Sequence, residues 1–503
     1  MKLNGFIGQA YNLKDVNIEC QRCVNLYPEV DESGNGKDQQ VMFLKSTPAL
    51  RPIFDVGSGP IRLIHFDGLE KDDGSYFQVN RLFVVSGAEV YRLTYDAFGS
   101  WDSLLLGSLG TTNGPVSAAS LSQDYGVTVF VDGSNENYVY RKTTTTTETF
   151  QTFTAAGFVP VQRATQVVWL DGYFIFIVEG SNQFYVSDWN SLNVSALSFA
   201  SAEGDPDNIL AIVANHRDLW LMNERTVEIF SNTGNADFPF ERVQGGFIEN
   251  GILAAFSLAK IGGTIFWLGR NNSGQGIIYA AEGAQHQRIS TYAIESAIQS
   301  YANPSNARGY CYQDNGHIFY VLNFDETSWC YDVTTKMWHE RCYTSDDGAL
   351  ERHRGQCHAF YPNFGKHIIG DYQNAKLYQF DDNYYTDALQ SITRLRTTPH
   401  ISASMKRVFY SQLQIDMKVG VGLDGSTDLV GHDPQIMMQY SDDGGNNWSN
   451  EKWASFGKLG EFKKRVIWRR LGQARDRVFR VKITDPVRVV FLNAEIELAV
   501  GVS

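Results

Sequence analysis

Seven short hydrophobic segments recur along this chain at a nearly constant spacing. They lie at residues 82–85 (LFVV), 128–131 (TVFV), 174–177 (FIFI), 219–222 (LWLM), 265–268 (IFWL), 318–321 (IFYV) and 367–370 (HIIG). Their first residues are 45 to 53 positions apart. A period of about 40–50 residues built from strands is typical of the four-stranded blade of a β-propeller.

Turn signals precede most of these segments, as Asp171-Gly172 and Asn315-Gly316 do, and a second turn and strand-like run follow. This is a hairpin pattern. A hairpin cannot bury its apolar faces alone, so neighbouring blades must stack and the ring must close. A β-sandwich with evenly spaced strands is the alternative, but sandwiches rarely keep one spacing for so long. We therefore predict an all-β fold with a propeller of about seven blades over residues 56–392.

The centres of six of these segments should be buried between blades. They are aromatic in every case: Phe83, Phe130, Phe176, Trp220, Trp267 and Phe319.

Length and composition favour a soluble protein with more than one domain. A chain of 503 residues exceeds what one ordinary core holds. No stretch approaches the roughly 18 consecutive apolar residues of a membrane helix, and the first residues (MKLNGFIGQAYNLK) lack an apolar signal core. Six cysteines are too few for a disulfide scaffold. We expect synthesis in the cytoplasm and reduced thiols.

The two ends of the chain lack the repeat. Residues 393–503 show alternating strand patterns at 408–419, 435–440, 462–468, 477–483 and 487–498. We expect them to form a separate β-domain, a small sandwich or jelly roll that serves as a platform. Residues 1–55 should pack against it, with the propeller inserted between the two ends. The only plausible helical turns are in linkers such as residues 290–301.

Positive charge is concentrated in residues 461–482 (EFKKRVIWRRLGQARDRVFRVK), although the whole chain has a net charge of −13. This stretch holds nine basic residues against two acidic ones: Lys463, Lys464, Arg465, Arg469, Arg470, Arg475, Arg477, Arg480 and Lys482. Alternation places Arg480 and Lys482 on one strand face and Phe479, Val481 and Ile483 on the other. Three interpretations stay open: a solvated face, an interface with an acidic protein surface, or a channel wall facing DNA.

Residues 441–448 (SDDGGNNW) match the Asp-box pattern S-x-D-x-G-x-x-W through Ser441, Asp443, Gly445 and Trp448. Ser and Asp side chains accept hydrogen bonds from backbone amides in such a turn, and Gly supplies the backbone angles. Asp-boxes also occur in sialidases, which raises an enzyme hypothesis. This box occurs once, outside the repeat, so we interpret it as a structural turn.

No set of residues predicts catalysis or a cofactor. Cys20 and Cys23 have the spacing of half a zinc site, but a second CxxC pair is missing. Two mixed groups, His353 with Cys357 and His358, and His339 with Cys342, leave a metal possible. The sequence contains no Gly-rich phosphate loop, HExxH or G-x-S-x-G motif. We predict no enzymatic activity, no cofactor and no metal.

Both ends of the chain resemble the packaged-DNA stabilisation proteins of short-tailed phages (podoviruses). At the N-terminal end the similar strings are residues 21–29 (QRCVNLYPE) and 44–50 (LKSTPAL). At the C-terminal end they are residues 440–448 (YSDDGGNNW), 456–458 (FGK) and 465–476 (RVIWRRLGQARD). The middle is similar only through its blade-like period.

The resemblance implies a structural virion protein, with six copies forming the hub or nozzle of a short tail. It implies as partners the head-to-tail adaptor ring above, a tail needle or plug, tail fibres or spikes, and double-stranded DNA in the lumen, bound without sequence readout. The hub would help to retain packaged DNA and to form the ejection channel. The alternative is a carbohydrate-binding or sialidase-like propeller of a tail adhesin. It would need converging Arg residues, a Tyr–Glu pair or Asp-boxes on several blades.

Overall fold

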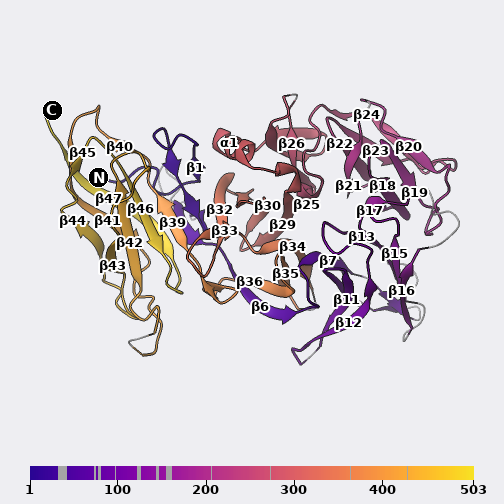
Figure 1. The fold of residues 1–503 in the computed structure, drawn as a ribbon, viewed down its shortest axis with the longest axis horizontal. Helices are drawn as coiled ribbons and strands as arrows, with labels where there is room; N and C mark the ends of the chain where they lie inside the picture. Colours follow the sequence, from indigo (N-terminus) through magenta and orange to yellow (C-terminus); the bar gives the residue numbers. More distant parts are fainter. Residues whose placement is uncertain are drawn as a thin grey trace.

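The computed structural model has two parts, a ring of small β-sheets and a β-sandwich beside it (Figure 1). It describes residues 1–31, 42–68, 70–72, 75–77, 81–96, 98–121, 126–142, 147–153, 161–205, 207–271, 273–362, 364–426 and 429–502. The expected fold class, a propeller with a second β-domain, is confirmed.

Four-stranded antiparallel units follow one another around the ring, and the described residues form seven of them. From the innermost strand outward, the first three are β7 (Ile61–Asp67), β10 (Arg81–Ser86), β11 (Glu89–Tyr95) and β12 (Trp101–Ser108); β13 (Ser117–Leu121), β14 (Val127–Val131), β15 (Tyr138–Lys142) and β16 (Glu148–Thr152); and β17 (Ala164–Leu170), β18 (Tyr173–Val178), β19 (Gln183–Val186) and β20 (Phe199–Ser201). A short hairpin, β8 (Glu70–Asp72) with β9 (Ser75–Phe77), lies between β7 and β10 in the sequence.

The next three units use the same order. They are β21 (Ile209–Asn215), β22 (Asp218–Asn223), β23 (Val227–Asn232) and β24 (Phe240–Ile248); β25 (Ala259–Ile261), β26 (Thr264–Arg270), β27 (Gly276–Glu282) and β28 (Gln285–Arg288); and β29 (Arg308–Asp314), β30 (His317–Asn323), β31 (Ser328–Asp332) and β32 (Met337–Thr344), with β33 (Leu350–Arg352) paired to β32. Each predicted hydrophobic segment falls on the second strand of its unit.

The last unit closes the ring with a strand from the other end of the chain. It contains β34 (Gly355–Tyr361), β35 (Lys366–Asp371) and β36 (Lys376–Asp381), and its outermost strand is β6 (Ala49–Asp55). β34 packs against β7 of the first unit, so the ring has no open end. Strand β6 belongs to residues 1–55, which the sequence analysis assigned to the platform, yet it pairs within the propeller.

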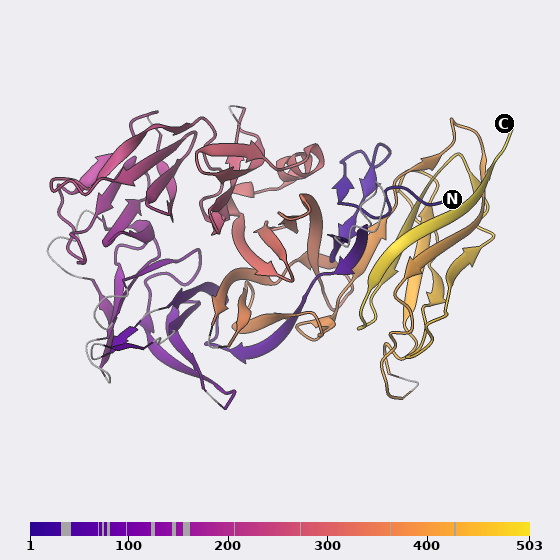
Figure 2. The same cartoon turned by 180° about the vertical axis from the view of Figure 1, so that it is seen from behind.

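The second part is a two-layer sandwich (Figure 2). One sheet has the order β4 (Leu26–Val30), β5 (Met42–Ser46), β47 (Val490–Val500), β41 (Val408–Met417) and β44 (Val466–Arg469), with β45 (Gln473–Ala474) paired to β41. The other has the order β3 (Cys23–Val24), β39 (Arg394–Thr397), β46 (Asp476–Ile483), β42 (Gln435–Ser441) and β43 (Lys452–Ser455), with β40 (Ile401–Ser402) paired to β46.

A few short elements complete the described chain. β1 (Tyr11–Asn12) pairs with β2 (Cys20–Gln21), and β37 (Thr386–Asp387) with β38 (Gln390–Ser391). The 3-10 turns η2 (Ala255–Ser257) and η3 (Pro304–Asn306) and the helix α1 (Tyr292–Ser300) lie between units. Thr291 caps α1 through its side chain, as expected for the linker at residues 290–301. No helix among the described residues is long and apolar enough to cross a membrane.

The six aromatic side chains predicted to lie between blades are all buried. Phe83 of the first unit shows how neighbouring blades interlock. Its ring meets Phe130 and Tyr140 of the second unit edge-on, with centroid distances of 5.5 and 4.9 Å. Such edge-to-face pairs add to the free energy gained by burying the rings.

One sheet runs without interruption from the propeller into the sandwich. β32 is the outermost strand of its unit, and β3 pairs with it in parallel through Val24 and Glu340. On its other side β3 pairs with β39, and β39 with β46. Backbone hydrogen bonds therefore connect the two parts directly, which limits any hinge motion between them.

Arg396 of β39 fixes the N-terminal segment in place. The side chain is fully buried, and its guanidinium donates to the carbonyl oxygens of Gly5 (2.6 Å), Phe6 (2.7 Å), Gln9 (3.1 Å) and Arg22 (3.2 Å). It also donates to Oε1 of Gln21. Burial lowers the pKa of Arg396, and the nearby charge of Glu19 offsets only part of this effect.

The start of the chain is an integral part of the sandwich. The amide of Leu3 donates to Ala494, and the terminal amine of Met1 donates to Ile496 of β47. We expect residues 1–55 and 393–503 to fold together as one domain and residues 56–392 to fold as the propeller. These domain boundaries stay a prediction.

Replacing Trp267 by Ala should lower the stability of the propeller by about 3–5 kcal/mol, the usual range for a large core side chain. Trp267 is fully buried and stacks on Tyr279 at 5.5 Å. The measurement is the urea midpoint of the propeller transition. Trp453→Ala is the control, because this side chain is 59% exposed and its loss should change stability by less than about 0.5 kcal/mol. Equal effects of the two substitutions would contradict the blade assignment.

Limited proteolysis near residue 56 should leave the N-terminal fragment bound to the rest of the protein without denaturant. Arg396→Gln should release it, because several buried carbonyl oxygens then lose a charged donor, each worth about 1.5–3 kcal/mol. Arg51→Gln is a matched control, since Arg51 is exposed and its ion pair with Asp381 lies at the surface. Release of the fragment from the unmodified protein would refute the shared domain.

Candidate functional site

The nine basic residues of 461–482 are divided between the two sheets of the sandwich. Arg477, Arg480 and Lys482 lie on β46. The other six lie on β44 or in the loops beside it. The run is therefore not one continuous cationic face.

Arg477 is a buried structural residue and not part of a surface. Its guanidinium donates to both carboxylate oxygens of Asp442, at 2.5 and 2.6 Å, and to the carbonyl oxygen of Leu471. It also lies over the rings of Tyr410 and Tyr440, at 4.6 and 4.1 Å from their centroids. These contacts tie the two sheets together, which differs from the surface role expected from the sequence.

Arg480 and Lys482 lie on the half-exposed face of β46, as the alternation predicted. Phe479, Val481 and Ile483 are buried on the opposite face. The Arg480 guanidinium lies 4.0 Å from the centroid of the Trp448 ring and donates to Gln439 at 2.6 Å. Lys482 pairs with Glu451 at 2.7 Å. Burial lowers the pKa of Arg480, and both cations already have partners within the domain.

The remaining six basic residues are exposed, and we call them the basic edge: Lys463, Lys464, Arg465, Arg469, Arg470 and Arg475. Arg465 donates to Gln414 at 2.7 Å, and Arg475 to the carbonyl oxygen of Met405. Lys463, Lys464 and Arg465 precede β44, the outermost strand of its sheet; Arg469 ends it, and Arg470 and Arg475 come after it. In both views β43 and β44 lie at the end of the molecule farthest from the propeller (Figures 1 and 2).

Large apolar side chains are exposed beside the basic edge. Phe462 is 73% exposed, Leu459 60% and Trp453 of β43 59%. β43 and β44 contact each other across the sandwich, and the Trp468 indole of β44 donates to the carbonyl oxygen of Lys452 of β43. The sequence pattern does not indicate this apolar group, because Trp453 and Leu459 lie outside the basic run and their strand pattern does not show which face is open.

The Asp-box residues form the expected turn. The Ser441 hydroxyl accepts from the amide of Gly445 at 2.8 Å, and Asp443 accepts from the amide and side chain of Asn447 at 2.9 and 2.7 Å. These hydrogen bonds lower the pKa of Asp443 to about 2. Gly445 has a φ of 102°, which side chains rarely allow.

The turn also contacts the N-terminal segment, which gives it a structural task. Asn446 donates to Asn17 at 3.3 Å, and a Cβ on Gly444 would come within 2.5 Å of the Asn17 side chain. Nearby, His400 bridges Asp476 and the carbonyl oxygen of Val16, at 2.6 and 3.0 Å.

Of the cysteines named as possible ligands, Cys20, Cys23 and Cys342 are buried and Cys357 is half-buried. Burial raises the pKa of the Cys20 thiol to about 12 and that of Cys23 to about 11, and the Cys23 thiol donates to the carbonyl oxygen of Leu26. His353 accepts from the amide of Gly355, and burial lowers its pKa to about 3. The described residues contain no group of three or more His, Cys, Asp or Glu side chains placed to hold a metal ion.

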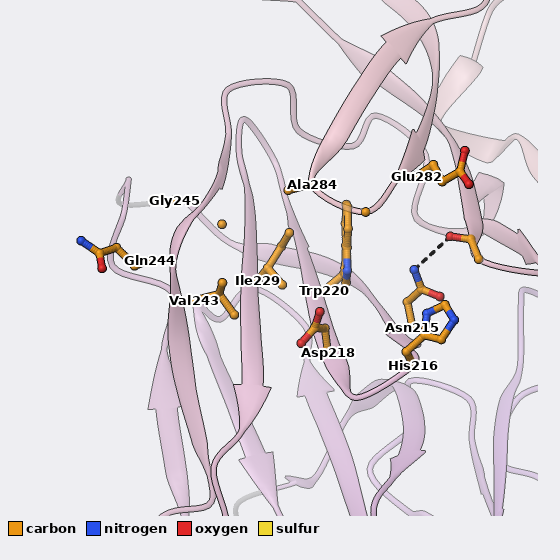
Figure 3. A pocket seen from close by; sticks show the side chains of 13 residues that line it. Asn215, His216, Asp218, Trp220, Ile229, Val243, Gln244, Gly245, Glu282 and Ala284 are labelled. Carbon is orange, nitrogen blue, oxygen red and sulfur yellow. Dashed lines mark hydrogen bonds between the residues drawn. The ribbon is translucent and has the colours of Figure 1, made fainter.

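A pocket of about 460 Å³ lies between the β21–β24 unit and the β25–β28 unit (Figure 3). Trp220, Ile229 and Val243 form its apolar wall, and Asp218 and Glu282 add acidic groups from the two neighbouring units. Asn215 donates to the carbonyl oxygen of Gly263 across this junction, at 3.1 Å. Among the described residues that line this pocket there is no arginine, whereas a sialidase-like site would need several.

Comparisons with known proteins agree with this architecture. The family model for the β-propeller of bacteriophage P22 Gp10 matches residues 8–385, and the model for the β-sandwich of the same protein matches residues 393–499. The tail hub protein gp10 of Salmonella phage P22 is 21% identical over 470 residues, covering 91% of each chain.

Solved structures resemble the chain more distantly. The Neurospora crassa Pan2 WD40 domain is 10% identical and covers 64% of this chain and 89% of its own, with a TM-score of 0.38. A Chaetomium thermophilum Polycomb Repressive Complex 2 chain is 9% identical and covers 66% of this chain and 97% of its own, with a TM-score of 0.41. At these scores neither likeness supports an argument about function.

The two family models together cover the propeller and the sandwich described above, and the relative matches nearly the full length of both chains. The chain therefore belongs to the P22 Gp10 family and is a structural tail hub protein of a phage virion.

Proposed function

We propose that six copies of this chain form the hub of a short tail, below the head-to-tail adaptor ring, where they help to retain packaged DNA and form its exit channel. Membership of the P22 Gp10 family supports the tail position. A tail needle or plug and fibres or spikes are the further partners that this role requires.

A hub that holds confined DNA must resist force, and the structure of the chain suits such a load. The sheet that passes from β32 through β3 and β39 into β46 joins the propeller to the sandwich by backbone hydrogen bonds. The Arg396 contacts fix the N-terminal segment across the same junction. We infer that the chain acts as one rigid body and retains DNA mechanically, without catalysis.

The observation that carries the proposal is the basic edge with its exposed apolar neighbours. Phosphate contacts need cations alone, whereas a protein interface combines an apolar centre with a charged rim. Phe462 and Trp453 supply such a centre and Lys463, Lys464 and Arg469 such a rim. The rest of this acidic chain, or an acidic adaptor, is the complementary surface, and DNA is the less favoured occupant.

Changing Lys463, Lys464 and Arg469 together to Glu should prevent assembly of the protein onto DNA-filled heads. Reversed charge on the rim repels an acidic partner. A matched control reverses Arg217, Arg225 and Lys366, three exposed cations of the propeller, and should assemble normally.

Assembly and DNA retention are measured together, because they separate the interpretations. Failed assembly supports the protein interface, and wild-type binding should then survive moderate salt. Normal assembly with leaking heads would instead indicate a channel wall, for which affinity falls about 10³–10⁵-fold between 50 and 200 mM salt with six to ten phosphate contacts. No effect on either measurement would leave the basic edge as a solvated face that protects an edge strand.

The pure protein should not hydrolyse sialosides or surface polysaccharides of the host. The Asp-box is used in a structural turn, and the pocket of Figure 3 lacks converging arginines among the described residues. Release of reducing sugar is the measurement. Turnover that disappears in Asp218→Asn or Glu282→Gln would overturn this expectation.

A further inference from the structure

A second pocket, of about 410 Å³, lies where the inner strands of several propeller units begin. Arg308 is the first residue of β29, Gln356 lies at the start of β34, and Pro115 comes two residues before β13. Inner strands of a propeller surround its central axis. The pocket therefore lies at one end of that axis, away from the sandwich surface discussed above.

Arg352 forms part of the wall and is only 8% exposed. Its guanidinium lies over the Tyr372 ring, 4.1 Å from the centroid. Its Nε and Nη2 atoms are buried and have no hydrogen-bond acceptor among the described residues. A buried guanidinium without an acceptor is costly, since its donors have lost water and gained no partner.

A second cation faces the same space. Burial lowers the pKa of Arg308, and the pKa of Arg352 is lowered by burial and by the charge of Arg308. A third arginine, Arg62, lies nearby, and burial together with the charge of Arg308 lowers its pKa to about 10. Its guanidinium makes four hydrogen bonds, to Gly87, Thr111 and Gly114, and so holds the wall at Gly114. The positive charges of Arg308 and Arg352 therefore lie together at this pocket, where the described residues offer few hydrogen-bond acceptors.

One carboxylate, that of Asp325, lies on the pocket wall and would repel a bound anion. Asp325 is exposed and accepts from the side chain of Asn306 at 3.0 Å. Its charge raises the pKa of both Arg308 and Arg352, although it accepts no hydrogen bond from Nε or Nη2 of Arg352 among the described residues. Asp325 therefore sets how strongly an incoming anion is attracted.

We propose that this pocket binds a small free oxyanion of the phosphate class between Arg308 and Arg352. Tetrahedral oxyanions accept several charge-assisted hydrogen bonds from guanidinium groups, which would satisfy the unpaired donors of Arg352. The Ser305 and Asn306 side chains at the rim provide further polar groups. The proposal does not depend on the tail role, because it rests on the propeller alone.

The test is thermal unfolding and calorimetric titration of the full chain with inorganic phosphate, against sodium chloride at equal ionic strength and pH. Phosphate should raise Tm in a saturable way, as expected for a ligand that binds only the folded state. Arg308→Gln and Arg352→Gln should each weaken phosphate binding at least tenfold. Arg225→Gln, an exposed arginine elsewhere on the propeller, should bind as the unmodified protein does.

Asp325→Asn keeps the test decisive if an arginine variant fails to fold. It removes the opposing charge and should tighten phosphate binding several-fold, which a purely structural role of the pocket would not produce. Equal effects of phosphate and chloride, or unchanged affinity in Asp325→Asn and Arg308→Gln, would overturn the proposal. Displacement of bound phosphate by a short DNA duplex would overturn the assignment to a free ion and indicate the DNA backbone as the source.

Discussion

The contacts of Arg396 hold together the region where both ends of the chain and the propeller meet. One buried guanidinium binds carbonyl oxygens from residues 5, 6, 9 and 22, although the arginine lies almost 400 residues further along the chain. Without this donor, the backbone of the first turns would lose its buried partners. The strand β3 that follows these residues pairs with β32 on one side and β39 on the other, so Arg396 lies beside the sheet that the propeller and sandwich share.

Buried arginines perform comparable tasks elsewhere in the molecule. Arg477 joins Asp442 to the aromatic rings between the two sandwich sheets, and Arg81 pairs with Asp67 in the first propeller unit. A guanidinium suits such positions, because its five donors can satisfy several acceptors while its flat face packs on rings. Arg352 departs from this pattern, since two of its donors lack acceptors among the described residues. That difference is the physical basis of the proposed oxyanion pocket.

The basic run shows how one stretch of sequence can serve several purposes. Arg477 stabilises the core, Arg480 covers Trp448, and the residues around β44 remain exposed. The number of basic residues in this stretch did not show which of them are buried and which are exposed. Burial depends on which sheet each strand joins. Exposed cations on and beside β44 also discourage edge-to-edge pairing between copies. An interface at this edge would therefore use side chains and not strand addition.

The repeat, the strand positions and the buried aromatic centres could be predicted from the amino-acid sequence. Each of these follows from local periodicity, which a hydrophobic segment such as residues 265–268 carries within a few residues. It also indicated the alternation in β46 and the Asp-box turn. Three features became visible only in the folded chain: β6 completes the last propeller unit, Arg477 is buried, and Arg308 and Arg352 share a pocket. These features depend on contacts between residues far apart in the chain, and local patterns contain no information about which distant partner a strand or charge will meet.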